Sequence, residues 1–337
     1  MTTKIGASGA AAAAGVAALL LALAAAAPGA PQAAERLVVY TSQPTEQMDE
    51  VIALFKRDHP EIEVELFRSG TTEVLNKLAA EFAAGDPQAD VLLIADAVAT
   101  EALAKEGRLM AYPEAPVEGY DPAFYDPEMR YFGTKLITTG IVYNTDLVQE
   151  PPTSWKDLAA EGADGQVVMP SPLYSGAAVI HVGTVVAQPG FGWDYFEDLA
   201  DNGALAARGN GSVIEAVATG QKAYGVLIDY MAFNAKEAGS PVDFVFPAEG
   251  VTAITQPVAI LATAKNVEAA KAFVDFQLSR EAQEHAVKQG YIPALAGVAP
   301  PPAYPDLSAM RVMEADPNVL LETTEEVKRG FADLFGG

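Results

Sequence analysis

"RLVVYTSQPTEQMDEVIALFKRDHPEIEVELF" (residues 36–67) has an apolar stretch of strand length at each end and a longer segment between them. Apolar residues in that segment recur every three or four positions, as on one face of a helix: Met48, Val51, Ile52 and Phe55. The pattern predicts a strand, a helix and a second strand at 36–41, 45–59 and 62–67. Two strands connected by a helix are typical of a parallel sheet.

The same alternation continues along the chain, with predicted helices at 71–85 and 97–107 and a predicted strand at 89–94. Polar residues follow each strand, namely Ser42 and Gln43, then Ser69 to Thr72 with Thr71 among them, and then Asp96. Right-handed crossovers place all loops of this kind at one edge of a parallel sheet. We therefore expect these polar loops to converge in space.

A second set of strands and helices begins after the apolar stretch at 136–148. Its loops hold Ser171, Ser175, Asn210, Ser212, Asp229 and Tyr230. Two strands near 134–142 and 246–258 are expected to cross between the sets. The sequence thus predicts an α/β protein of two lobes with crossing hinge strands. Lobe 1 is expected at 35–136 and 258–337 and lobe 2 at 137–257, with a ligand pocket where their loop edges meet.

One of these loops, "SPLYSGAAVI" (171–180), has the features of an anion-binding site. Ser175 is a favoured helix N-cap residue, and after Gly176 a helix of small residues is predicted from Ala177 to Val186. The first N–H groups of a helix have no partner within it and carry partial positive charge. Such a helix start can hold an anion, although an ordinary N-cap would give the same pattern.

Composition limits the classes of partner. The chain of 337 residues has 45 Asp and Glu against 21 Lys and Arg, a net charge of −24, which disfavours nucleic acid. Cysteine is absent from the sequence, so disulfides and thiolate metal sites are excluded. Residues 1–34 form an alanine-rich apolar segment that we interpret as a secretory signal peptide, removed on export to the periplasm, with an uncleaved membrane anchor as the alternative.

Enzyme motifs are not evident. His59, His181 and His285 stand in unrelated segments, and the sequence contains neither a zinc-binding histidine pair nor a phosphate-binding P-loop. We therefore expect no catalytic residues, no metal site and no cofactor. Two carboxylates acting as in a glycoside hydrolase are the enzyme alternative.

As a set and in this order, several motifs resemble the periplasmic solute-binding proteins of ABC importers. They are the stretches at 37–81, 89–107, 140–146, 171–178, 225–239 and 269–284. The nearest branch is the one labelled ferric-iron-binding, which also contains binders of phosphonates and sugar phosphates. This resemblance implies a type II Venus-flytrap fold that closes on a small ligand and then docks to an ABC permease in the inner membrane.

The likeness to ferric members is incomplete. In the family, iron is held by an early His, a carboxylate and a Tyr pair, beside an anion at a Ser-Gly-Ala helix start. Here those positions read Gln43-Pro44, Ala95-Asp96 and Tyr230-Met231, whereas Ser175-Gly176-Ala177 is intact. Because ferric iron prefers hard anionic oxygens, the substitutions favour an anionic solute over iron.

The sequence therefore predicts a monomeric, exported solute-binding component of an ABC transporter. Its ligand is expected to be a small organic anion such as a phosphonate or a sugar phosphate, with ferric iron as the alternative. The candidate ligand-binding residues are Ser42, Gln43, Ser69, Thr71, Asp96, Ser175, Gly176, Ala177, Asn210, Asp229 and Tyr230.

Overall fold

The computed structural model describes residues 35–336, and the predicted signal peptide lies outside this range. The first group of elements follows the predicted alternation closely. Strand β1 (Glu35–Thr41) pairs in parallel with β2 (Ile62–Arg68) and with β3 (Val91–Leu93). The strands are followed by α1 (Thr45–Asp58), α2 (Thr71–Ala84) and α3 (Ala97–Lys105). The βαβ prediction is confirmed here.

The second group repeats this arrangement. Strand β5 (Val167–Pro170) pairs in parallel with β6 (Leu205–Ala207) and with β7 (Tyr224–Ile228). Its helices are α4 (Gly176–Ala187), α5 (Gly192–Asp201), α6 (Asn210–Ala218) and α7 (Asp229–Glu237). Helix α4 follows Ser175 as predicted and starts at Gly176, one residue before the predicted start at Ala177.

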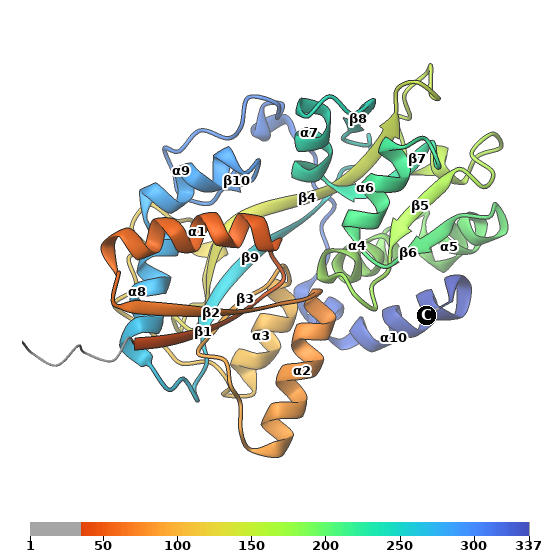
Figure 1. Cartoon of the computed structure of the whole chain (residues 1–337). Coiled ribbons are helices and arrows are strands. Elements are labelled where there is room, and N and C mark those ends of the chain that lie inside the picture. The colour runs from red at the N-terminus through yellow and green to blue at the C-terminus, as the bar shows by residue number, and fades with distance from the viewer. Residues whose placement is uncertain (1–34, 337) are drawn as a thin grey trace, which may run out of the picture. The chain divides into compact units, whose positions relative to one another are not determined.

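Two long antiparallel strands, β4 (Phe132–Asn144) and β9 (Thr252–Ile260), run side by side between the groups (Figure 1). β9 also pairs with β3, while β4 pairs with β7, β8 (Val242–Val245) and β10 (Ile292–Pro293). The crossing strands are thus confirmed, but the second one begins at Thr252 rather than near residue 246. Gly250, at φ 117°, lies in a turn before that strand.

The helical segment after β9 is divided in two. The apolar periodicity of residues 267–290 predicts a single amphipathic helix, but the structure has α8 (Val267–Leu278) and α9 (Arg280–Lys288). Ser279 separates them with an extended backbone (φ −68°, ψ 153°), and its hydroxyl accepts a hydrogen bond from Ala282 N. A serine that caps a new helix in this way competes with continuation of the preceding one.

Separate hydrophobic clusters support the two groups. Phe55 of α1 packs with Phe273 of α8 in one cluster, and Trp155 packs with Phe196 of α5 in another. Helix α10 (Pro317–Phe335) contributes Phe331 to the cluster of Trp155 and lies beside α4. The lobe boundaries stay a prediction, in which α10 belongs to lobe 1. Short 3-10 helices are η1 (Pro122–Phe124), η2 (Trp155–Ala159) and η3 (Leu307–Ala309).

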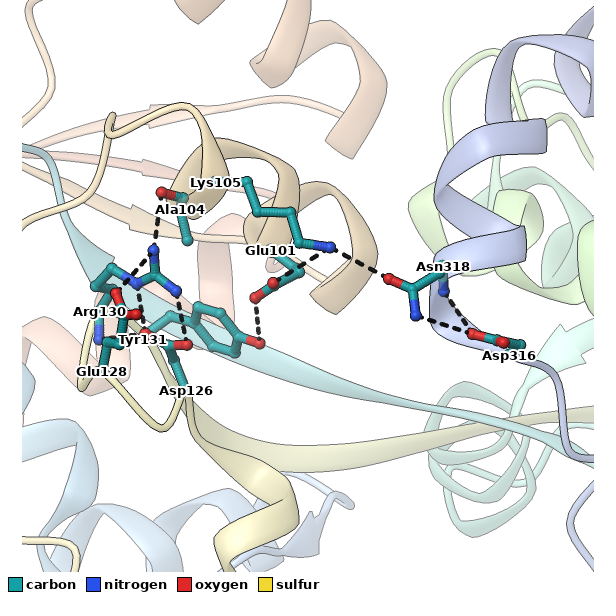
Figure 2. A network of polar contacts seen from close by, with 9 residues as sticks. All are labelled: Glu101, Ala104, Lys105, Asp126, Glu128, Arg130, Tyr131, Asp316 and Asn318. Atoms are coloured by element: carbon teal, nitrogen blue, oxygen red, sulfur yellow. Dashed lines mark hydrogen bonds and ion pairs between the residues drawn. The ribbon is translucent and has the colours of Figure 1, made fainter.

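Polar contacts tie α3 to the chain before β4 and to the start of α10, as Figure 2 shows. Arg130 donates to Asp126 through Nε (2.6 Å) and to the Ala104 carbonyl through Nη1 (3.1 Å). Lys105 Nζ donates to Asn318 Oδ1 at 3.2 Å. Helix α10 is therefore anchored at its N-terminal end as well as along its apolar face. Within residues 35–336, no helix has both the length and the apolar character needed to cross a membrane.

Candidate functional site

A cavity of about 470 Å³ lies where helix starts from the two groups of elements meet. Pro44, Thr45 and Glu46 line it at the start of α1, and Gly70 and Thr71 line it at α2. The opposite group contributes the starts of α4, α6 and α7 through Ser175, Ala177, Gly209, Asn210, Gly211, Ser212 and Tyr230. The convergence of polar loops expected from the sequence therefore produces the wall of one cavity.

The helix starts supply hydrogen-bond donors. Helices α1, α2 and α6 have no side-chain cap on their first N–H groups. In α2, however, the Thr72 N–H donates to the Tyr174 carbonyl at 3.3 Å and is not left to a ligand. Helix α4 is capped by Ser175 Oγ, which accepts from Ala178 N at 3.3 Å. Uncapped N–H groups and the positive ends of helix dipoles favour an anionic ligand.

Two exposed arginines add positive charge to the cavity wall. Arg68 donates to the backbone carbonyls of Gln43 (3.2 Å) and Ser42 (3.3 Å) and to the Tyr174 hydroxyl (3.4 Å). Arg208 stacks on the Tyr174 ring with 4.4 Å from Cζ to the centroid, and it pairs with Glu73 at 2.8 Å. None of the three acceptors of Arg68 carries a charge, so its guanidinium charge stays available to a ligand.

Two side-chain acceptors in the same wall have no hydrogen-bond partner among the described residues: Asn210 Oδ1 and Gln256 Oε1. Gln256, on β9, is only 1 % exposed. Asn210 is oriented by Ser175, because its Nδ2 donates to Ser175 Oγ at 3.2 Å. A buried polar atom without a partner costs free energy, and a ligand hydroxyl or amine would satisfy both atoms.

Two tyrosines of the wall, Tyr230 and Tyr291, are neutral groups. Tyr230 stacks on Tyr291 with 4.2 Å between ring centroids. Burial raises the pKa of Tyr230 to about 12 and the pKa of Tyr291 well above its usual value, since a phenolate would lose its hydration. Both rings therefore offer apolar faces and neutral hydroxyl groups. Met231 also lines the cavity.

Most of the residues singled out in the sequence do line this cavity. They are Ser42, Gln43, Thr71, Ser175, Ala177, Asn210 and Tyr230. Ser69, Asp96, Gly176 and Asp229 are not part of the cavity wall. Their local contacts explain their positions, and the ligand roles of all eleven stay proposals.

The two carboxylates turn toward their own backbone and a neighbouring strand. Asp96 is 5 % exposed and accepts from Ala99 N at 2.8 Å as the N-cap of α3. Asp229 is fully buried and accepts from the N–H and hydroxyl of Thr138 on β4 at 2.8 and 2.6 Å. Burial raises the pKa of each carboxyl to about 6.

Ser69 and Gly176 also have local roles in the structure. Ser69 donates its hydroxyl hydrogen bond to Glu73 in the first turn of α2. A Cβ added to Gly176 would lie 2.7 Å from the Ala95 carbonyl and 2.8 Å from Thr71 Cγ2. Gly176 therefore allows the start of α4 to approach the opposite group of elements closely.

Sequence reasoning missed three prominent wall residues, Gln256, Tyr291 and Arg208. Gln256 interrupts the apolar run of β9, which is the one local signal that could have identified it. Tyr291 and Arg208 follow no recognisable motif. Among residues 35–336, no group of three or more His, Asp or Glu side chains is placed to bind a metal.

Comparisons with known proteins agree with this architecture. Residues 41–284 match the family model described as bacterial extracellular solute-binding protein. A probable ABC transporter periplasmic-binding protein of Sinorhizobium fredii is 26 % identical over 281 residues, which cover 79 % of this chain and 76 % of that protein.

Two solved structures extend the comparison. The periplasmic binding protein AfuA of Actinobacillus pleuropneumoniae, solved with exogenous fructose-6-phosphate bound, has a TM-score of 0.80 and 25 % identity, covering 89 % of this chain and 98 % of that one. Iron-bound HitA of Pseudomonas aeruginosa has a TM-score of 0.77 and 20 % identity, covering 88 % and 99 %. The chain therefore belongs to the bacterial extracellular solute-binding proteins of ABC importers and has the two-lobe α/β fold of periplasmic binding proteins.

Proposed function

We propose that this protein captures a phosphorylated sugar or polyol in the cavity between its helix starts and delivers it to an ABC permease. Family membership implies a small-molecule ligand, a permease partner and an exported location. The homologous proteins are solute-binding proteins rather than enzymes. A monomeric state and removal of residues 1–34 stay predictions.

The observation that carries the proposal is the pairing of two kinds of polar group in one cavity. Uncapped helix N-termini and Arg68 suit an anionic group. The unpartnered oxygens of Asn210 and Gln256 suit hydrogen-bond donors. A ligand with a phosphate at one end and hydroxyl groups at the other satisfies both. The volume of about 470 Å³ is in the usual range for small-molecule sites.

The similarity to AfuA supports this ligand class, because that protein was solved with fructose-6-phosphate bound. The alternative is ferric iron, as in HitA, whose 20 % identity supports a shared fold. Gln43 and Met231 line the cavity at the positions where ferric members of the family have a His and a second Tyr, and neither supplies the hard anionic oxygen that ferric iron prefers. These two residues therefore favour the phosphorylated ligand.

The test is isothermal titration of the purified mature protein with fructose 6-phosphate, methylphosphonate, sorbitol and ferric citrate. We expect binding of fructose 6-phosphate and much weaker binding of the other three, since each lacks the phosphate or the hydroxyl groups. Tight binding of ferric citrate with a visible charge-transfer band would contradict the proposal.

The variant Gln256→Met tests the hydroxyl-binding end of the cavity. Removal of the acceptor should weaken fructose 6-phosphate binding by about 10- to 100-fold, because the ligand hydroxyl loses its buried partner. The matched control is Gln277→Met. Gln277 is 3 % exposed and its Nε2 has no partner within residues 35–336, but it does not line the cavity. If the two variants bind fructose 6-phosphate with equal affinity, Gln256 does not contact the ligand.

A further inference from the structure

Directly behind the cavity wall lies a buried lysine. Lys135, on the crossing strand β4, is 2 % exposed. Its Nζ donates to Gln43 Oε1 at 2.8 Å and lies 4.6 Å from the centroid of the Tyr291 ring. Gln43 and Tyr291 both line the cavity, whereas Lys135 does not. One side chain therefore separates this ammonium group from the space available to a ligand.

Within the part of the chain that the structure describes, Lys135 has no carboxylate within ion-pair distance. Glu50 on α1 accepts instead from Gln289 Nε2 at 3.0 Å and pairs with His285 Nε2 on α9 at 3.2 Å. Gln289 also accepts from Gln43 Nε2 at 3.1 Å. The Gln43 amide is therefore held with its oxygen toward the lysine, and the protein supplies dipoles rather than a counter-ion.

The charged or titratable groups near Lys135 are Tyr291, Tyr230 behind it, His285, Glu50, and Arg68 and Glu46 of the cavity wall. The helices packed around it also carry Asp49, Lys56, Arg57 and Asp58 on α1, Glu268, Lys271 and Asp275 on α8, and Arg280, Glu281, Glu284 and Lys288 on α9. Burial raises the pKa values of both tyrosines and lowers that of His285, so these three groups are neutral near pH 7. Burial also lowers the pKa of Lys135 to about 7. Lys135 can therefore gain or lose its charge near neutral pH.

We propose that the anionic group of the bound solute acts as the counter-ion of Lys135, so that ligand binding and protonation of this lysine promote each other. This rests on the proposed function, because it requires an anionic ligand. An anion in a site of low dielectric stabilises a nearby ammonium group and raises its proton affinity. By linkage, the protein then takes up a proton as it binds. Lys135 is a positioning and charge-supplying residue that acts through Gln43.

The sign of the pH dependence follows from this linkage. Above pH 7 the free protein holds Lys135 largely neutral, whereas the complex holds it protonated. Affinity must then fall as pH rises, by up to about tenfold per pH unit, until the lysine of the complex also loses its proton. A neutral residue at position 135 removes this dependence.

The experiment is isothermal titration with fructose 6-phosphate at about pH 8 in two buffers of different ionisation enthalpy. A phosphate monoester is fully ionised at this pH, since its second pKa is about 6, so protons taken up are bound by the protein. For the wild type we expect uptake of about one proton per ligand and weaker binding at about pH 9 than at pH 8.

Lys135→Met keeps the aliphatic stem without the amine. This variant should bind more weakly at pH 7, take up no proton and show a flat affinity between pH 7 and 9. The control Lys236→Met removes an exposed lysine paired with Asp243 and should keep the wild-type proton uptake. If Lys135→Met fails to fold, proton uptake by the wild type is still a test, because binding of fructose 6-phosphate without uptake would overturn the role of Lys135.

The possible failures are distinguishable. Binding of fructose 6-phosphate by the wild type without proton uptake would overturn the role of Lys135 and leave the proposed function intact. The same proton uptake in Lys135→Met as in the wild type would also overturn it. Absence of fructose 6-phosphate binding at every pH would overturn the proposed function and this inference with it.

Discussion

His181 shows how one buried residue determines the response of this fold to acid. It lies in α4, is 3 % exposed, packs against the Trp155 ring with 4.7 Å between centroids, and contacts Thr252 Oγ1 through Nδ1 at 3.2 Å. Burial lowers its pKa to about 3, because a charged imidazole would lose its hydration. Below about pH 6.5 the unfolded chain therefore binds a proton that the native state does not.

His181→Gln should unfold more easily than the wild type at pH 7.5, because ring packing is lost. The wild type, however, loses stability through His181 as pH falls from about 6.5 toward 3, and the variant does not. The stability difference should shrink by about 3 kcal/mol between pH 7.5 and 4.5, because the loss runs over the two pH units below 6.5 at about 1.4 kcal/mol each. Urea unfolding at both pH values measures it. The carboxyl groups of Asp96 and Asp229 change stability with pH in the opposite sense, but they are present in both proteins and cancel in the difference. If the free energies of unfolding of the two proteins change in parallel with pH, His181 does not have this role.

At the scale of the element, the start of α4 has a structural role, and we predict a binding role for it as well. Ser175 Oγ caps the helix and also accepts from Asn210 Nδ2. Ser175→Ala should lower the free energy of unfolding by about 1 kcal/mol, the usual value for an N-cap. It should also weaken fructose 6-phosphate binding several-fold, because the Asn210 amide loses the acceptor that orients it.

Ser279→Ala is the matched control for this helix start. Ser279 caps α9 by accepting from Ala282 N at 3.2 Å, and it does not line the cavity. In urea unfolding, the Ser279→Ala variant should lose about as much free energy of unfolding as Ser175→Ala. Its affinity for fructose 6-phosphate, measured by titration, should be unchanged. If Ser175→Ala also binds with wild-type affinity, α4 begins with an ordinary cap and its start has no part in binding.

At the scale of the whole described chain, the segments predicted as opposite lobes meet beside the cavity. Thr72 N donates to the Tyr174 carbonyl at 3.3 Å, and Thr72 Oγ1 donates to the Pro172 carbonyl at 3.1 Å. Gly70 makes this approach possible, because a Cβ there would lie 2.5 Å from the Tyr174 carbonyl oxygen. The backbone at Gly70 has φ −63°, so the requirement is for space rather than for an unusual conformation.

Gly70→Ala should therefore prevent full closure around a ligand. We expect fructose 6-phosphate affinity to fall more than about tenfold, because one group of elements can no longer contribute its donors. Small-angle X-ray scattering of the saturated variant should give a larger radius of gyration than that of the saturated wild type. Gly107→Ala, outside the cavity wall and with no atom within 4 Å of an added Cβ, should close normally. If the Gly70→Ala complex has the same radius of gyration and the same affinity as the wild-type complex, Gly70 is not required for closure.

The sequence by itself determined the order and type of most elements, because hydrophobic periodicity and helix starts are local properties. Met48, Val51 and Phe55 are buried on one face of α1 as their spacing predicts, and Ser175 begins α4. It also identified most of the polar loops at the cavity, since parallel strands place such loops at one edge. The break at Ser279 was missed because the apolar periodicity continues across it.

Only the tertiary structure decided which polar side chains line the cavity. Asp229 follows β7 as a ligand residue would, but Thr138, 91 positions away, binds its carboxylate. Gln256 comes to the site from β9, and Tyr291 comes from the residue just before β10. Lys135 comes from β4. Whether a buried side chain is satisfied by the protein or left for a ligand depends on neighbours distant in sequence, and no local pattern carries that information.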